Sequence, residues 1–281
     1  MSFSVLILAH NEAANIGPCL NSLFTAASGG PSLDIAVLDS GSTDGTTEIV
    51  RDIGIPVYHR PFDTFADQRN WGADSIPWAF DWILHLDADE RVDRELLCEI
   101  VAETRDSQKD AYLLANRLFF MGRWIRYSSR YPHYQARLLH RRRSRFVARG
   151  HGQYLDHAVH NVGRLRHPYD HYNFSKGVSE WVEKHNRYST AEAIEMASSQ
   201  VTFSAAFRHL FKAHTREDFQ QAVKTMASFL PLRPLVRFIY LYCWKWGFLD
   251  GRPGFDYCVL MAFYECMINL KQREIAQGRT P

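Results

Sequence analysis

The sequence predicts an α/β protein with a mostly parallel sheet, followed by a helical extension at the C-terminal end. Over residues 3–105, apolar runs typical of buried strands alternate with helical patterns. Several of these runs end in polar or acidic residues, and the last third instead carries long apolar and aromatic stretches flanked by basic residues. The alternating order favours parallel strands joined by right-handed crossovers.

The bulk composition narrows the class of protein. The 281 residues are enough for one large α/β domain or for a domain with an appendage. A net charge of +2 is too small to suggest nucleic acid as the main partner. The five cysteines include no C-x-x-C pair, which argues for a reducing compartment without a disulfide framework or a zinc site. The apolar run at 5–9 is too short for a signal peptide, so we expect a cytoplasmic protein.

The first strand is expected at residues 3–9, where a nearly continuous apolar run indicates burial on both faces. A helix over 14–27 carries apolar residues at helical spacing and ends before Gly29-Gly30-Pro31. We expect the next elements in this order: a strand at 33–38, a short helix at 46–53, a strand at 55–59, a helix opening at 68–73, a strand at 79–86, an amphipathic helix at 92–105, a strand at 111–120 and a helix at 178–197.

Two carboxylates follow the apolar run that ends at Leu86. Asp87 and Asp89 are two residues apart, so on an extended chain they share one face. Converging carboxylates are unfavourable unless a cation or protons neutralise them, and oxygen ligands suit Mg²⁺ or Mn²⁺. The alternative is a solvated turn that caps the next helix. The position at the carboxyl end of a buried strand favours a ligand site.

A loop of small, turn-prone residues follows the second strand, from Asp39 to Thr46. Asp39 could accept hydrogen bonds from a nucleotide base or a ribose, as carboxylates at such positions commonly do. Taken alone, the segment is only a turn-rich loop. No G-x-G-x-x-G follows the first strand and no Walker A sequence is present, which weakens a dinucleotide site and excludes a P-loop ATPase.

As a set, these motifs resemble glycosyltransferase family 2. The resemblance rests on the segments 6–12 and 37–46, on Asp87-Ala88-Asp89 and on Arg69-Asn70, and it covers about the first 105 residues. It implies a Rossmann-like sheet of GT-A type, a nucleoside diphosphate sugar donor such as a UDP-sugar, a divalent metal (Mn²⁺ or Mg²⁺) and inversion at the anomeric carbon.

The resemblance also assigns roles to residues. Those expected to bind the donor are His10, Asn11, Glu12, Asp39, Gly41, Arg69, Asp87, Ala88 and Asp89. Within this set, Asn11, Glu12 and Asp39 are expected to hold the nucleoside. Asp87 is expected to face the ribose side, and Asp89, together with Asp87, to form the metal site on the diphosphate.

An inverting transfer needs a base that takes the proton of the acceptor hydroxyl. In many similar bacterial sequences the region at 150–157 looks like His-Glu, but here the glutamate position is Gln153, which cannot take a proton. We therefore expect Asp156, the nearest carboxylate, to be the catalytic base. His151, Gln153 and Arg187 are expected to contact the acceptor or the diphosphate.

A dense run of arginines lies between Arg137 and Arg149. It is either a solvated basic face or a surface for an anionic acceptor such as a lipid pyrophosphate or a phosphorylated glycan. RNA is a third possibility, which the near-neutral balance of the remaining chain disfavours.

Two apolar, aromatic stretches, 235–249 and 257–270, dominate the last third. Both are shorter than a spanning helix and carry internal charge, while Trp244, Trp246 and flanking basic residues suit a membrane interface. We expect a helical hairpin lying in one leaflet, with a buried helical pair as the alternative. This part is also similar to lipopolysaccharide-core β-glucosyltransferase-like members of the family, which implies a lipid-linked, lipopolysaccharide or exopolysaccharide acceptor at the inner face of the bacterial inner membrane.

The sequence thus predicts a peripheral membrane, inverting glycosyltransferase in three parts. These are a nucleotide-sugar-binding half at 1–110, an acceptor-binding and catalytic region at 111–197, and membrane-associating helices at 198–281. The alternatives are a catalytically silent sugar-nucleotide-binding or membrane scaffold protein, and a nucleotidyltransferase. The last would share the sheet but should carry a glycine-rich basic loop after the first strand.

Overall fold

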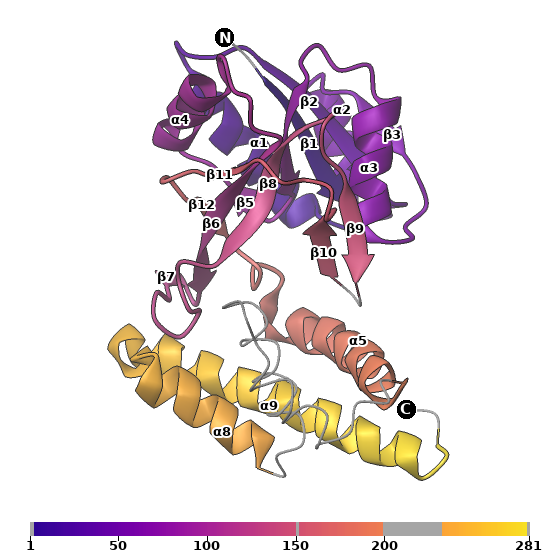
Figure 1. Cartoon of the computed structure of the whole chain (residues 1–281), viewed down its shortest axis with the longest axis vertical. Coiled ribbons are helices and arrows are strands. Elements are labelled where there is room, and N and C mark those ends of the chain that lie inside the picture. Colours follow the sequence, from indigo (N-terminus) through magenta and orange to yellow (C-terminus); the bar gives the residue numbers. More distant parts are fainter. Residues whose placement is uncertain (1–2, 150–151, 199–231, 280–281) are drawn as a thin grey trace. The chain divides into compact units, whose positions relative to one another are not determined.

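The computed structural model describes residues 3–149, 152–198 and 232–279. The chain divides into two compact units, residues 1–178 and 179–281, and each is described by itself. The first unit holds the sheet, and its order of strands and helices can be followed in Figure 1.

The strands of the first unit alternate with helices up to α4 and then follow one another directly. The strands are β1 (Phe3–Ala9), β2 (Leu33–Asp39), β3 (Val57–His59), β4 (Trp82–Asp87), β5 (Glu90–Arg91), β6 (Ala111–Phe120), β7 (Arg123–Trp124), β8 (Tyr134–His140), β9 (Phe146–Arg149), β10 (Gly152–Leu155), β11 (Val162–Arg164) and β12 (Tyr169–His171). The helices are α1 (Ala13–Ala27), α2 (Thr46–Asp52), α3 (Phe65–Ser75) and α4 (Arg94–Thr104).

Within the described residues, ten strands form one mixed sheet, and β9 pairs with β10 in a separate hairpin. The path through the large sheet is β3-β2-β1-β4-β8-β6-β12-β5, with β7 and β11 paired to β6. The four strands β3, β2, β1 and β4 are parallel, whereas β8 runs antiparallel to both β4 and β6. The predicted mostly parallel sheet is therefore confirmed for its first half, and β8 introduces an antiparallel strand in its centre.

Helices cover the two faces of the sheet. Alternate side chains of β1 and β4 pack on one face with α1 and α4, and on the other face with α3, which Figure 1 shows on opposite sides. Gly72 of α3 lies directly against Leu6 of β1, where an added Cβ would come within 2.5 Å of the leucine side chain. This close approach fixes α3 against the strands that carry the candidate site.

The sequence-based element boundaries hold to within a few residues. The predicted strand at 111–120 coincides with β6, whereas the strand predicted at 79–86 is shorter, β4 beginning at Trp82. The expected division at residue 110 falls between α4 and β6, so strands from both sides of it share one sheet.

The second unit is helical. It contains most of α5 (Gly177–Ser198), and then α8 (Arg233–Ile239), the π-helical turn η1 (Tyr240–Trp244), the 3-10 turn η2 (Gly247–Asp250) and α9 (Gly251–Ala276). The predicted apolar stretch at 235–249 is thus broken into three short helical segments, while the stretch at 257–270 lies inside the single long helix α9.

Ion pairs and hydrogen bonds join the helices of the second unit. Arg233 of α8 pairs with Glu265 of α9 at 2.6 Å. Further along α9, the ammonium of Lys271 donates to Asn186 Oδ1 at 2.7 Å and to Ser189 Oγ at 2.8 Å, which ties α9 to α5. Among the helices that the structure describes, none combines the length and the apolar character needed to span a bilayer.

Candidate active site

The parallel register places the polar residues after β1, β2 and β4 at one edge of the sheet, which we call the rim. Ala9 is paired with Asp39, and Leu8 with Asp87. Because the carboxyl ends of parallel strands meet at the same edge, the predicted donor residues are brought together there. The amide of Ala88, itself buried, donates to the Leu8 carbonyl at 3.2 Å and keeps the chain beyond β4 next to β1.

The loops after β1 and β2 are joined by hydrogen bonds. Asn11 adopts a left-handed conformation with φ of 54°. Its amide donates to Ser42 Oγ at 2.8 Å, and its side-chain oxygen accepts from the Thr43 amide at 2.8 Å. The Glu12 amide donates to Thr46 Oγ1, also at 2.8 Å. The two loops therefore form one hydrogen-bonded surface.

Asp39 lies at the base of this surface and is 1% exposed. Its Oδ2 accepts from the amides of Gly41 and Ser42 at 2.9 and 3.0 Å, and lies 3.3 Å from His59 Nδ1, while Ser42 Oγ donates to its Oδ1 at 2.5 Å. Burial alone would raise the pKa of Asp39, but the hydrogen bonds from Ser42 and Gly41 outweigh it and hold the pKa below its ordinary value. Oδ1 also accepts from the Ser42 amide at 3.3 Å, so the loop after β2 surrounds both oxygens of this carboxylate.

Asp87 is held by two buried arginines. Arg69 of α3 donates to its Oδ1 at 2.5 Å, and Arg137 of β8 donates to its Oδ2 at 2.9 Å. Burial acts in the opposite direction, yet the charges of Arg137 and Arg69 keep the pKa of Asp87 well below its usual range. With both oxygens bound to guanidinium groups, Asp87 is poorly suited to bind a metal ion directly.

Asp89 has a different partner, His171. The Asp89 Oδ2 and His171 Nε2 atoms are 3.3 Å apart, because β12 pairs with β5 and sets His171 opposite Glu90. The amide of Tyr172 donates to the Asp89 carbonyl at 2.9 Å and fixes this register. Burial would lower the pKa of His171, but the charge of Asp89 and the hydrogen bond to it raise the pKa above its ordinary value.

These two side chains fit a divalent cation. Two ligands bound at about 2.1 Å and at right angles lie roughly 3 Å apart, close to the distance between Asp89 Oδ2 and His171 Nε2. Imidazole with carboxylate suits Mn²⁺ better than Mg²⁺, which prefers oxygen. Three or more ligand side chains do not converge in the described part of the chain, so substrate oxygens or water would complete the coordination.

Lys176 adds a cation to the rim. Its ammonium lies 2.7 Å from Glu12 Oε1 and donates to the Asn11 carbonyl at 3.2 Å. Burial raises the pKa of Glu12 despite the opposing hydrogen bonds from Asn15 and Lys176. Sequence reasoning marks the segment 171–177 as rich in groups that can bind phosphate, but it gives His171 no metal role, because only the return of the chain through β12 brings this segment to the rim.

The remaining donor candidates are simpler to place. His10 is exposed, and its Nε2 lies 3.5 Å from the side-chain nitrogen Nδ2 of Asn11. Gly41 turns the loop with φ of 93°, a conformation that glycine adopts without strain. Arg187 lies on α5, in the second unit, so its position relative to the rim is not described.

The β9–β10 hairpin packs beside α3 (Figure 1). Gln153 is part of the cluster, since its Oε1 accepts from Arg69 Nε at 2.8 Å. Asp156 comes directly after the C-terminal end of β10. Its Oδ1 accepts from the Ala158 amide at 3.0 Å. His151, the other candidate, lies outside the described residues.

Asp156 lies toward the edge of the sheet that is opposite the rim. Its amide donates to the Arg145 carbonyl, and the Arg145 side chain pairs at 2.7 Å with Asp74, near the C-terminal end of α3. Because α3 leads into the start of β4, this end of the helix lies away from the carboxyl ends of the strands. The structure therefore does not bring Asp156 to Asp87 and Asp89, as its assignment as the base requires.

The arginine run does not form one surface. Arg137 is buried against Asp87, whereas Arg141 and Arg142 lie 3.0 and 3.1 Å from Asp81, which precedes β4. Arg143 lies over the Trp82 ring, 5.5 Å from its centroid. Most of the described partners of this run lie at the edge away from the rim, so the run is not gathered at the candidate site, and its role toward an anionic acceptor stays a prediction.

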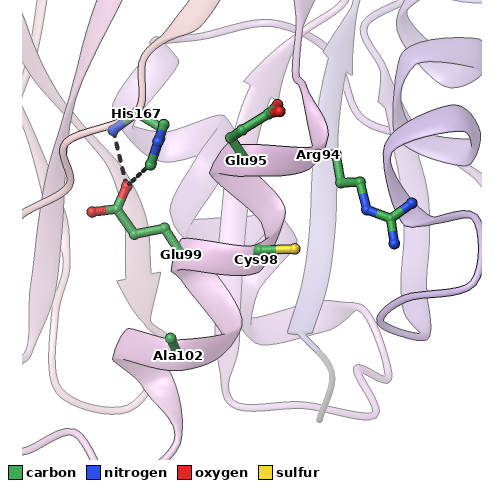
Figure 2. A pocket seen from close by; sticks show the side chains of 6 residues that line it. All are labelled: Arg94, Glu95, Cys98, Glu99, Ala102 and His167. Carbon is green, nitrogen blue, oxygen red and sulfur yellow. Dashed lines mark hydrogen bonds and ion pairs between the residues drawn. The ribbon is translucent and has the colours of Figure 1, made fainter.

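A shallow hollow lies elsewhere on the first unit, along α4 (Figure 2). Glu99 accepts hydrogen bonds from the amide and from Nδ1 of His167, both at 2.9 Å, and Arg94 lies along the same helix. The hollow is lined by none of the predicted donor or metal residues. It does not contribute to the candidate active site.

Comparison with known proteins agrees with this geometry. Residues 4–171 match the model of Glycosyl transferase family 2. The chain is 31% identical over 217 residues to the lipopolysaccharide core biosynthesis glycosyltransferase LpsC of Rhizobium meliloti, covering 71% of this chain and 73% of that protein. It is 36% identical over 110 residues to an uncharacterized glycosyltransferase of Rickettsia bellii, covering 39% of this chain and 35% of that protein.

A solved structure shares the fold. The mannosyltransferase PcManGT from Pyrobaculum calidifontis, in complex with GDP-Man and Mn²⁺, aligns with a TM-score of 0.53 and 14% identity, over 96% of this chain and 86% of that one. The family match spans the whole rim, from the first strand to His171. The chain therefore belongs to glycosyl transferase family 2, and it is a glycosyltransferase of GT-A fold.

Proposed function

We propose that the protein transfers a sugar, with inversion, from a nucleoside diphosphate sugar to a lipid-linked glycan acceptor at a membrane surface. The observation that carries the proposal is the pair Asp89 and His171, 3.3 Å apart beside the arginine-held Asp87. This arrangement provides a place for a metal ion and a fixed carboxylate at the carboxyl ends of the strands, where α/β sheets bind ligands.

Different residues of the rim bind different parts of the donor. Asn11, Glu12, Gly41 and Asp39 hold the nucleoside on the ordered surface of the two loops, with His10 and Ala88 at its border. Asp87 accepts hydrogen bonds from the ribose hydroxyls. These contacts would orient the donor before the reaction, which is a large part of catalysis in group transfer.

Asp89 and His171 would hold the divalent cation, Mn²⁺ or Mg²⁺, with Mn²⁺ favoured by the imidazole. When bound there, it would supply positive charge that stabilises the departing diphosphate. Mn²⁺ in the structure of the mannosyltransferase of the same fold supports this proposal. Lys176 is placed at the rim to add a second positive charge near the same group.

In the transfer itself, the acceptor oxygen forms a bond to the anomeric carbon as the bond to the diphosphate oxygen breaks. The acceptor proton passes to a base on the protein. Sequence reasoning proposes Asp156 for this role, with His151 as the competing residue of the segment 150–157. The contacts of Asp156 favour a structural role, because its carboxylate closes the turn after β10.

The acceptor and the membrane are proposed from the second unit and from the printed name of LpsC. Trp244 and Trp246, at the turn between α8 and α9, are 75% and 58% exposed, and Phe248 and Leu249 are exposed beside them. Arg252 is 81% exposed at the start of α9. Exposed tryptophans with adjacent cations suit the headgroup region of an anionic bilayer.

A donor panel tests the proposed function. Each common nucleotide sugar is incubated with the full chain, Mn²⁺ and a bacterial membrane extract, and the release of nucleoside diphosphate is measured with and without the extract. We expect one donor to give extract-dependent release. No release above the level of an Asp89→Ala variant from any donor would favour a catalytically silent protein.

A further inference from the structure

A second carboxylate, Glu90, lies beneath the acidic strand end and takes no part in the mechanism above. Glu90 is fully buried, and its partner Arg137 is 3% exposed. A buried ion pair contributes little net stability compared with apolar residues of the same size, because both charges lose their hydration. Stability therefore does not explain the presence of this pair, and its contacts with Asp87 indicate a role in the site.

Glu90 holds Asp87 in two ways. Its Oε2 accepts from the backbone amide of Asp87 at 2.9 Å, and its Oε1 accepts from Arg137 Nη2. The same Nη2 donates to Asp87 Oδ2 at 2.9 Å. Glu90 therefore fixes the main chain of Asp87 directly and its carboxylate through Arg137.

Arg137 is itself fixed by a hydrogen bond to Tyr169. Its Nε donates to the Tyr169 hydroxyl at 3.3 Å, and that hydroxyl donates to Gln135 Oε1 at 2.8 Å. On the other side, Arg69 occupies Asp87 Oδ1. Each oxygen of Asp87 is thus bound by a different guanidinium group, so the carboxylate cannot rotate without breaking a charged hydrogen bond.

When the two arginines and the two carboxylates of this cluster are all ionised, their charges cancel. Arg69 and Arg137 offset Asp87 and Glu90, which leaves Asp89 and His171 as the neighbouring pair with capacity for a cation. Asp87 still has unused acceptor positions, because a carboxylate accepts about four hydrogen bonds. Neutral donors such as hydroxyl groups can use these positions.

We propose that Glu90 and Arg137 are positioning residues that fix Asp87 for the ribose hydroxyls of the donor and keep it out of the metal site. The inference rests on the proposed function, since it requires a nucleoside diphosphate donor. It predicts that the pair controls recognition of the ribose and not the affinity for the metal.

The test compares ribose with deoxyribose. The nucleoside diphosphate among UDP, GDP, CDP and dTDP that binds the full chain most tightly identifies the base, and binding of its ribo, 2′-deoxy and 3′-deoxy forms is measured by calorimetry with Mn²⁺. We expect the parent to prefer the ribo form over at least one deoxy form by about tenfold or more, as for a hydrogen bond to a charged group.

Two single variants perturb the positioning. Arg137→Lys keeps the charge but loses the planar guanidinium group and the Nε donor to Tyr169 that orient it, and Glu90→Gln keeps the size but loses the charge. We expect the preference for the ribo form to fall to within about twofold in both variants, while Mn²⁺ binding, measured by electron paramagnetic resonance, stays within about twofold of the parent. Asp81→Asn, which perturbs an arginine–aspartate contact at the other edge, should keep the parent preference.

The outcomes separate the two proposals. If no nucleoside diphosphate binds the parent, or if the parent does not distinguish ribose from deoxyribose, the donor site itself is wrongly assigned. If the parent distinguishes them and both single variants do so equally well, Glu90 and Arg137 are structural only. Should a single variant fail to fold, the double variant Glu90→Leu/Arg137→Met leaves no unpaired charge and takes the same test.

Discussion

His171 Nε2 lies 3.3 Å from Asp89 Oδ2, although Asp89 is in the turn between β4 and β5 and His171 ends β12, far along the chain. The pairing of β12 with β5 produces this contact, and the hydrogen bond from Tyr172 to Asp89 fixes it. The relationship gives the acidic strand end a nitrogen ligand, which the sequence motif alone does not contain.

Loss of the imidazole should weaken the metal site. In His171→Ala we expect Mn²⁺ affinity, in the presence of the nucleoside diphosphate, to fall by at least about tenfold, the lower end of the range for groups that support metal ligands. Electron paramagnetic resonance of free Mn²⁺ measures this. His167→Ala is the matched control, because His167 forms a similar contact with Glu99 outside the site (Figure 2). Equal affinities in both variants would show that His171 does not bind the metal.

The same contact should make metal binding depend on pH. Asp89 raises the pKa of His171 above 6.5, so the proton stays on the imidazole to a higher pH than in an isolated histidine. Because the metal needs the neutral imidazole, Mn²⁺ affinity should rise as the pH increases through and above 6.5 and should fall below it. His171→Gln should flatten this dependence. A parent affinity that stays constant between pH 6 and 8 would contradict the assignment.

Variants of two residues of the segment 150–157 identify the catalytic base. Asp156 closes the turn after β10 through the Ala158 amide, so Asp156→Asn, whose side chain keeps an acceptor oxygen, should retain most of the transfer rate. His151→Ala should lose about 10²-fold or more if its imidazole takes the proton. Rates are measured at saturating donor. A loss of about 10²-fold in Asp156→Asn, with His151→Ala as fast as the parent, would restore Asp156 as the base.

The exposed turn between α8 and α9 should control binding to membranes. Burying a large apolar side chain contributes about 1.5–3 kcal/mol, so Trp244→Ser/Trp246→Ser should lower the partition onto anionic vesicles by about tenfold or more. Flotation at low salt measures the bound fraction. Phe24→Ser, which removes an exposed aromatic residue of α1, should have no effect. A parent protein that stays at the bottom of the gradient would show that the turn is not a membrane anchor.

Local sequence patterns were sufficient for the parallel half of the sheet. Buried parallel strands appear as continuous apolar runs, which located β1, β2 and β4, and the residues after them lie at the rim because parallel strands end together. The position of Asn11, Asp39 and Asp87 at the rim follows from that rule, whereas their roles toward the donor came from the family resemblance.

The local patterns do not predict which strands pair when they are far apart in the sequence. Neither the insertion of β8 between β4 and β6 nor the return of β12 to β5 has a local signal, so His171 and Lys176 were not assigned to the rim. The position of the arginine run in the fold had no local signal either. Its partners Asp81 and Asp74 precede it by many residues, and only the fold shows which edge of the sheet they occupy.

The central claim is metal-dependent sugar transfer at Asp89, and the incorporation of labelled sugar into membrane-extract glycolipid tests it most directly. The account predicts incorporation by the parent with Mn²⁺, loss of incorporation in EDTA, recovery when Mn²⁺ is restored in excess, and none by a folded Asp89→Ala variant under any of these conditions. Full incorporation by the parent in EDTA, or by Asp89→Ala, would contradict the account.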